Sequence, residues 1–120
     1  MRRIALLALL LACGGTSGQG TGGGPGGGGT PPSGTPVTIN WTLAAQTSTV
    51  VTTLAAGSPV QWHNGDTTTH TIQPDSAPPP NVIASINPGA TSAQQTIATP
   101  GTYHYHCAIH PAMHGTLIVQ

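Results

Sequence analysis

Three side chains that could bind a soft metal ion stand close together near the end of the chain. In the stretch CAIHPAMHG, Cys107, His110 and Met113 follow one another at intervals of three residues. A thiolate, an imidazole and a thioether are ligands that bind soft and borderline transition metals. Pro111 cannot extend a β-ladder and restrains the backbone beside His110. The short loop must turn back at once, so chain geometry alone should keep these donors together.

A fourth donor must come from another part of the chain, and His70 is the strongest candidate. It follows the turn signal Asn64–Asp66 and begins the segment HTI, so we expect it at the end of a strand. Its position has the same parity as Ile72, which we expect to face inward. Two imidazoles, one thiolate and one weak thioether suit a copper ion that cycles between Cu(I) and Cu(II). Zinc would prefer another Cys or His to Met, and hard cations would require carboxylates.

The elements that must position these donors are short, alternating strands. The candidates from Pro36 onward are VTINWTL, STVVTTL, VQW, HTIQ, NVIASI, TSAQQTIA, TYHYHC and GTLIVQ. They are rich in Val, Ile and Thr, turn signals separate them, and no useful helical period is present, which predicts a β-sandwich or barrel. In VTINWTL we expect Val37, Ile39, Trp41 and Leu43 to share one face.

Alternation also assigns faces to the strand that leads to the cysteine. In TYHYHC, Tyr103, Tyr105 and Cys107 should point into the protein, and His104 and His106 should point to solvent. His63 and His114 also follow residues that we place inward, so we expect them at the surface. A surface copper or zinc site built from His104 and His106 is an open alternative, as is simple core packing of the Cys, His and Met.

The composition excludes several classes of function. The chain has 120 residues, its only Lys or Arg side chains are Arg2 and Arg3, and its only acidic side chains are Asp66 and Asp75. A basic surface for nucleic acid is therefore missing from the body of the chain. A catalytic carboxylate pair is also disfavoured, and we interpret both aspartates as turn residues.

The N-terminal segment is typical of export. Two arginines precede an apolar run that is too short to span a bilayer, and residues 1–12 therefore read as a signal peptide. The run ends in LLAC, which resembles the lipobox of bacterial lipoproteins and implies a lipid on Cys13. The alternative is an ordinary signal peptide that leaves Cys13 as an unmodified thiol. Residues 13–35 are then a disordered Gly/Pro-rich linker, and residues 36–120 the folded domain.

The segment GTYHYHCAIHPAMHG resembles the C-terminal signature of the cupredoxins, the small blue copper proteins. The spacing Cys-x-x-His-x-x-Met, with Pro directly after His, resembles the amicyanins in particular within this plastocyanin-like family. VQWHNGDTTTHTI resembles the other ligand segment of the family. The resemblance implies a cupredoxin-like Greek-key β-sandwich of about eight strands over residues 37–120. It also implies one type 1 copper ion, with His70, Cys107 and His110 as equatorial ligands and Met113 as the axial ligand.

One position departs from the family pattern. Most cupredoxins have Asn directly after the first His, where it ties the two ligand loops together, and this chain has Thr71. A hydroxyl can donate one hydrogen bond, but it reaches less far than an amide.

The resemblance implies a single-electron carrier and not an enzyme. We expect a monomer that meets its redox donor and acceptor near His110, binds no nucleic acid and is held to a membrane at the cell envelope through Cys13. Copper delivery or buffering in the envelope is the alternative function. A domain of a multicopper oxidase or nitrite reductase would need ligands from a second such domain.

Overall fold

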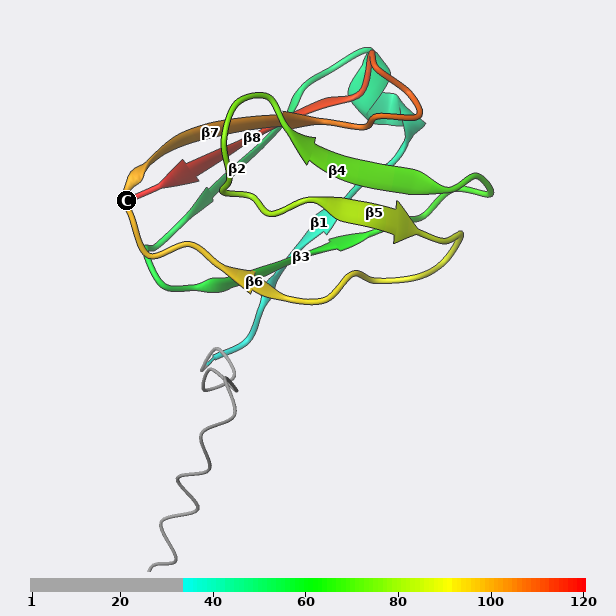
Figure 1. Cartoon of the computed structure of the whole chain (residues 1–120). Coiled ribbons are helices and arrows are strands. Elements are labelled where there is room, and N and C mark those ends of the chain that lie inside the picture. Colours follow the sequence, from blue (N-terminus) through cyan, green and yellow to red (C-terminus); the bar gives the residue numbers. More distant parts are fainter. Residues whose placement is uncertain (1–33) are drawn as a thin grey trace, which may run out of the picture.

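Two β-sheets pack face to face in the computed structural model, which describes residues 34–120 (Figure 1). The signal peptide and almost the whole linker predicted from the sequence lie outside the described residues. The first sheet has the order β1-β3-β6, and the second has the order β2-β8-β7-β4-β5. The predicted all-β sandwich of about eight strands is therefore confirmed for the described part of the chain.

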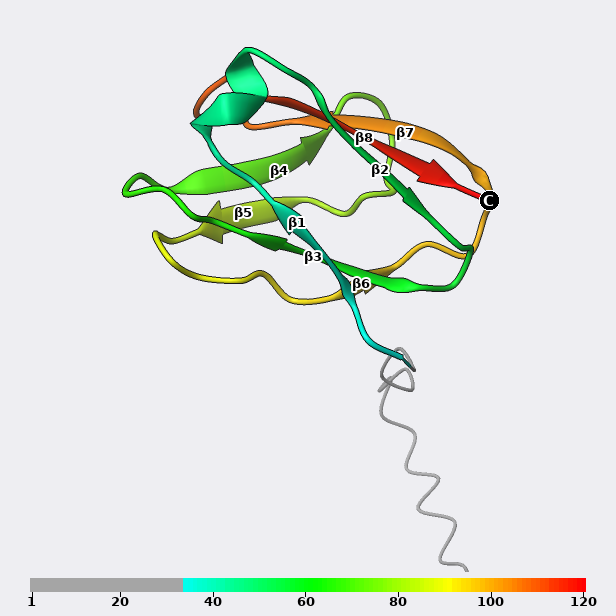
Figure 2. The same cartoon turned by 180° about the vertical axis from the view of Figure 1, so that it is seen from behind.

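The strands follow the alternating segments of the sequence. In the first sheet, β1 (Val37–Asn40) runs parallel to β3 (Pro59–His63), and β3 pairs antiparallel with β6 (Gln95–Thr96). In the second sheet, β2 (Val50–Leu54) runs parallel to β8 (His114–Val119). The remaining pairs are antiparallel and join β8 to β7 (Gly101–His106), β7 to β4 (His70–Pro74), and β4 to β5 (Ile83–Ile86). Seen from behind, β1 and β2 lie on the near side of the molecule (Figure 2).

Aromatic side chains form the centre of the core between the sheets. The rings of Trp41 and Tyr105 lie 5.1 Å apart, and Trp62 meets Tyr105 edge to face at 5.6 Å. All three residues are fully buried, and burial raises the pKa of Tyr105 to about 12. Gly115 lies opposite Tyr105 in the ladder, and a Cβ there would lie only 2.1 Å from the ring carbon Cζ. The glycine therefore makes room for the tyrosine ring.

The first predicted strand is longer than the observed one. The observed strand β1 ends at Asn40, and the chain then forms a 3-10 helix, η1 (Leu43–Gln46). Leu43 is 40% exposed, so the prediction that it shares an inward face with Ile39 and Trp41 is wrong. The backbone N–H of Leu43 donates to the carboxylate of Asp66 at 2.6 Å, which favours the turn over a further strand residue.

Two further predictions are corrected in part. Only Gln95–Thr96 of the segment TSAQQTIA forms a strand. The hydroxyl of Ser92 accepts the N–H of Trp62 at 3.0 Å, so a side chain replaces a ladder bond at that point. Tyr103 is half-buried and not fully inward, and its hydroxyl donates to the carbonyl of Thr99 at 2.8 Å.

Within residues 34–120, no helix has the length and apolar character needed to cross a bilayer.

Candidate metal centre

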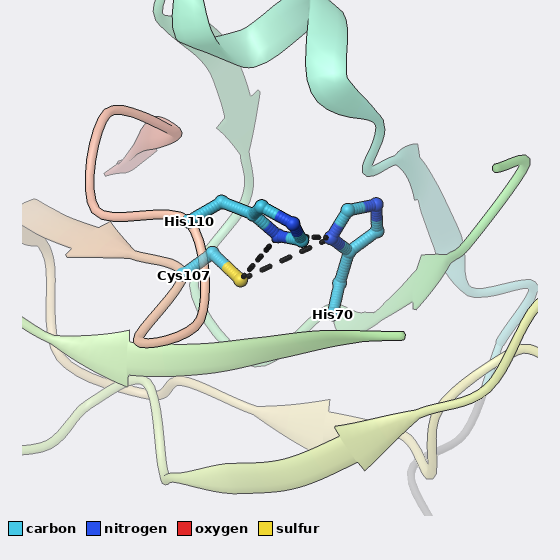
Figure 3. A group of neighbouring side chains, drawn as sticks. All are labelled: His70, Cys107 and His110. Carbon is cyan, nitrogen blue, oxygen red and sulfur yellow. Dashed lines mark hydrogen bonds between the residues drawn. The ribbon is translucent and has the colours of Figure 1, made fainter. Parts of the chain in front are cut away.

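Two neighbouring strands bring distant parts of the chain to one end of the second sheet. His70 is the first residue of β4, and Cys107 directly follows β7, which pairs with β4. The loop after Cys107 carries His110 and returns the chain into β8, so both ligand segments meet at the same end of the sandwich (Figure 3). The predicted meeting of the two segments is confirmed.

The three donor atoms lie within reach of a single ion. Cys107 Sγ is 3.9 Å from His70 Nδ1 and 3.8 Å from His110 Nδ1, and the two Nδ1 atoms are 3.2 Å apart. One donor atom from each residue lies within 4.8 Å of the others. His70 and Cys107 are fully buried, whereas His110 is half-buried. Such a group can hold a metal ion that a partner protein approaches from the side where His110 reaches the surface.

Met113 closes the ligand loop from inside the protein. Its side chain is fully buried, its N–H donates to the carbonyl of His110 at 2.8 Å, and its carbonyl accepts the N–H of Cys107 at 3.1 Å. These two bonds fix the loop in the tight turn predicted from Pro111. Met113 therefore lies in the same fixed loop as His110, and ligation by its thioether stays a prediction.

Thr71 ties the two ligand segments together. Its backbone N–H lies 3.3 Å from Cys107 Sγ, and its hydroxyl donates to the same sulfur at 3.7 Å. The hydroxyl also accepts the N–H of Ala108 at 2.7 Å. A threonine therefore reaches both the thiolate and the backbone of the ligand loop, although its side chain is shorter than that of asparagine. Trp41 extends this link into the core, because its Nε1 donates to the carbonyl of Thr71 at 3.1 Å.

Asp66 is the functional residue that the sequence prediction missed. Its interpretation as a turn residue is incomplete, because its Oδ2 lies 2.8 Å from His70 Nε2. Desolvation raises the pKa of Asp66, but the hydrogen bonds from His70 and from the Leu43 N–H outweigh it, so the pKa lies below its ordinary value. The only sequence signal was the four-residue interval before His70, which brings side chains together reliably only in a helix.

The other four histidines are not part of this cluster, and the prediction that they face solvent holds fully for two of them and in part for the other two. His63 bonds Thr91, His104 bonds Thr116, and His106 Nδ1 lies 2.6 Å from Asp75. Asp75 therefore also does more than form a turn. His104 and His114 are exposed, and His63 and His106 are half-buried.

In the predicted alternative surface site, the Nδ1 atoms of His104 and His106 contact Thr116 and Asp75 respectively, and metal binding there stays a prediction. Within residues 34–120, the group of His70, Cys107 and His110 is the one that brings three such donors together.

The chemistry of the cluster fits copper. Two imidazoles and a thiolate, with a thioether in the adjoining loop, form the donor set of redox-active copper sites that transfer electrons. Within the part of the chain that the structure describes, no carboxylate belongs to this donor group, so the set does not suit a hard cation. Two N–H or O–H groups aimed at the sulfur suit a thiolate bound to a metal better than a neutral thiol.

Comparisons with solved structures place the fold among the cupredoxins. A reduced Cu(I) form of an amicyanin variant at pH 4 aligns with a TM-score of 0.57 and 20% identity, over 70% of this chain and 81% of the other. A purple cupredoxin from Nitrosopumilus maritimus aligns with a TM-score of 0.59 and 21% identity, over 69% of this chain and 98% of the other. At these identities the alignments support the fold alone.

Sequence comparison gives the family. Among curated proteins, none matches the chain in sequence. The family model for the cupredoxin-like domain matches residues 30–119, which is most of the 120-residue chain. That match covers both ligand segments and every strand of the two sheets, and the chain therefore belongs to the cupredoxin-like domain family.

Proposed function

We propose that this protein is a single-electron carrier that binds one type 1 copper ion through His70, Cys107 and His110, with Met113 as a weak axial ligand. The observation that carries the proposal is the convergence of two Nδ1 atoms and one sulfur, from two segments of the chain, within 4.8 Å. The amicyanin variant with the same fold is itself a copper protein, in its reduced Cu(I) form.

The ligand count favours electron transfer over catalysis. Catalytic metals usually keep one position open for a substrate, whereas four protein donors would leave none. The bonds within the loop from His110 to Met113 and the bonds from Thr71 to Cys107 hold the donors before the metal arrives. A centre held in this way needs little rearrangement when the copper gains or loses an electron, which suits a carrier.

Electrons would enter and leave through His110. This residue is half-buried, and its neighbours Ala108, Ile109, Pro111 and Ala112 are exposed. The result is a small apolar surface around the accessible ligand, here called the His110 patch and defined by residues 108–112. Small apolar patches suit weak and transient docking of redox partners. We propose that the donor and the acceptor both use this patch and that the carrier works as a monomer.

The proposed location is the cell envelope, with a lipid on Cys13. Support comes from the sequence alone: Arg2 and Arg3, the apolar run of residues 4–12, and the lipobox-like LLAC. Expression in a bacterial host with a labelled fatty acid tests this proposal. Label should enter the wild-type protein and not Cys13→Ser, and an unlabelled wild-type protein would argue for an ordinary signal peptide.

An optical titration tests the copper site. Adding Cu(II) to the metal-free protein should give an intense visible thiolate-to-copper band that saturates at one equivalent and bleaches with ascorbate. Cys107→Ser should lose the band, whereas His104→Ala should keep it, because His104 lies outside the cluster. A colourless wild-type complex would overturn the proposal.

Copper delivery is the alternative function, and exchange kinetics separate it from electron transfer. Two of the three donors are fully buried, which favours slow loss of the ion. We expect Cu(I) to pass slowly to a competing chelator while electrons pass rapidly to and from the bound ion. Rapid chelator exchange would favour delivery or buffering.

A further inference from the structure

The imidazole of His70 is held from both sides. Its Nδ1 faces the thiolate of Cys107 and the ring of His110, as Figure 3 shows. Its Nε2, on the far side of the ring, meets Asp66 Oδ2 at 2.8 Å. An imidazole that donates Nε2–H to a carboxylate has its Nδ1 lone pair free for a metal. The His70 ring is fully buried, whereas the Asp66 side chain is 23% exposed, so solvent reaches this contact only from the side of the carboxylate.

Asp66 is not a free surface side chain. The N–H of Leu43 donates to the same oxygen, Oδ2, at 2.6 Å, and the N–H of Asp66 donates to Asn64 Oδ1 at 2.9 Å. Asn64 is itself fully buried, and its Nδ2 donates to the carbonyls of Thr68 and Ile86 at 2.8 Å each. The carboxylate is therefore fixed by contacts to η1, to its own turn and, through Asn64, to β5.

We propose that Asp66 is a positioning residue that sets the tautomer of His70 and makes it a stronger copper donor, which lowers the reduction potential of the centre. The proposal rests on the copper site proposed above. A carboxylate bonded to the outer nitrogen of a ligand histidine orients the ring and raises its basicity. The negative charge also stabilises Cu(II) more than Cu(I), because Cu(II) carries the larger charge.

The competing explanation is that Asp66 only closes the turn by binding the Leu43 N–H. Asp66→Asn separates the two roles, because an amide oxygen can still accept the Leu43 N–H but carries no charge. Asp75→Asn is the matched control. It removes the same charge from the other carboxylate–histidine pair, Asp75 and His106, which lies at the surface outside the metal cluster.

The first experiment needs no metal. Long-range proton–nitrogen NMR correlations on the metal-free full chain report which ring nitrogen of His70 carries the proton. We expect a single Nε2–H tautomer in the wild type and in Asp75→Asn, and a mixture in Asp66→Ala. A proton on Nδ1 in the wild type, or a tautomer that is unchanged in a folded Asp66→Ala, would overturn the proposal. If Asp66→Ala does not fold, the wild-type tautomer and the reduction potential of Asp66→Asn, measured in the second experiment, decide the outcome.

The second experiment uses the copper-loaded protein. In Asp66→Asn, Cu(II) affinity should fall by about 10–100-fold, the range seen when such outer partners of metal ligands are removed. Cu(I) affinity should change less, so the potential should rise by about 59 mV for each tenfold difference between the two losses. Asp75→Asn should stay near the wild-type potential. Equal potentials in the two variants would overturn the proposal.

Failure of the copper-carrier proposal and failure of the role proposed for Asp66 give different results. A colourless wild-type complex with a fixed Nε2–H tautomer would reject the copper carrier and leave Asp66 as the residue that orients His70. A blue wild-type protein in which Asp66→Asn has the potential of Asp75→Asn would keep the carrier and reject the role of Asp66.

Discussion

At the scale of single residues, the candidate site depends on hydrogen bonds to the cysteine sulfur as well as on the donors themselves. Thr71 supplies two of these contacts and also accepts the N–H of Ala108. Hydrogen bonds to a thiolate withdraw electron density from it, so the sulfur donates less to the metal. The Thr71 hydroxyl should therefore favour Cu(I) and raise the reduction potential.

Replacing the hydroxyl tests this role. Thr71→Val keeps the shape and the backbone N–H but removes both hydroxyl contacts. We expect a lower reduction potential by voltammetry and a loss of about 1 kcal/mol in the free energy of unfolding, the usual contribution of a hydrogen bond. Thr71→Ser keeps the hydroxyl and should resemble the wild type in both measurements. A potential that is the same in Val and Ser variants would contradict this prediction.

The residue types of the site were predictable, but the partners around them were not. Cys107, His110 and Met113 lie in one short loop, and the parity of His70 with Ile72 placed it inward, where both are fully buried. Asp66 escaped prediction because a four-residue interval inside an irregular turn does not imply a contact. Its position depends on the Leu43 N–H, which is 23 residues away in the sequence.

At the scale of elements, the strand pair β7–β8 carries the ligand loop, and its close packing depends on one glycine. Gly115 pairs with Tyr105 in the ladder, and the tyrosine ring lies over the position where a side chain would be. The ring cannot move away easily, because Trp41 and Trp62 pack against it and all three are fully buried. A side chain at Gly115 must therefore displace part of the core next to the metal loop.

A pair of glycine substitutions tests this packing. Gly115→Ala should lower the free energy of unfolding by about 1–3 kcal/mol, the cost of overpacking a core, in urea unfolding of the metal-free protein. Gly101→Ala is the matched control in the same strand pair. Its Cβ would lie 3.2 Å from the half-buried ring of Tyr103, which has more room to shift. Equal losses in the two variants would contradict the prediction.

The alternation of apolar and polar residues predicted the strands well where the two faces of a strand differ in burial. It predicted them less well where a side chain takes the place of a backbone hydrogen-bond acceptor. The inward positions Val60, Trp62 and Tyr105 follow the period of two and are fully buried. The strand around Gln95–Thr96 is shorter than its sequence pattern because the hydroxyl of Ser92 takes a ladder bond of Trp62. Leu43 leaves the pattern because Asp66 captures its N–H.

At the scale of the whole molecule, the metal should contribute to stability. The donors come from β4 and from the loop between β7 and β8, so an ion bound to them links β4 directly to that loop. The described domain is small, and small domains bury a limited share of their unfolded surface. An ion that binds the folded state and not the unfolded chain stabilises by mass action.

Anaerobic thermal unfolding with Cu(I) measures this contribution. At a free ion concentration 100 times the dissociation constant, the gain is about 2.7 kcal/mol. For a domain of this size each kcal/mol moves Tm by about 4–8 °C, so we expect an increase of about 10–20 °C. Cys107→Ser should lose most of the increase, and His104→Ala should keep it. An increase that is the same in Cys107→Ser would place the stabilising ion elsewhere.

The charge of the molecule determines how it meets partners. The only Lys or Arg side chains in the sequence are Arg2 and Arg3, and within residues 34–120 each of the two aspartates contacts a histidine. Charge steering is therefore weak, and docking should rely on the apolar His110 patch, where Ile109 is 52% exposed. Electron self-exchange between copies of the protein isolates this surface, because both partners are then known.

The self-exchange rate of the copper protein, measured by NMR line broadening, should change little between low and high salt. Ile109→Lys places like charges face to face when two patches meet. Two unit charges about 6 Å apart in water repel by about 0.7 kcal/mol, which slows exchange by about threefold at low salt and less at high salt. Val82→Lys is the matched control, since Val82 is exposed to a similar degree, at 54%. Val82 precedes the first residue of β5, whereas Ile86, which pairs with His70, is the last residue of that strand. Equal slowing in the two variants would mean that electrons do not pass through the His110 patch.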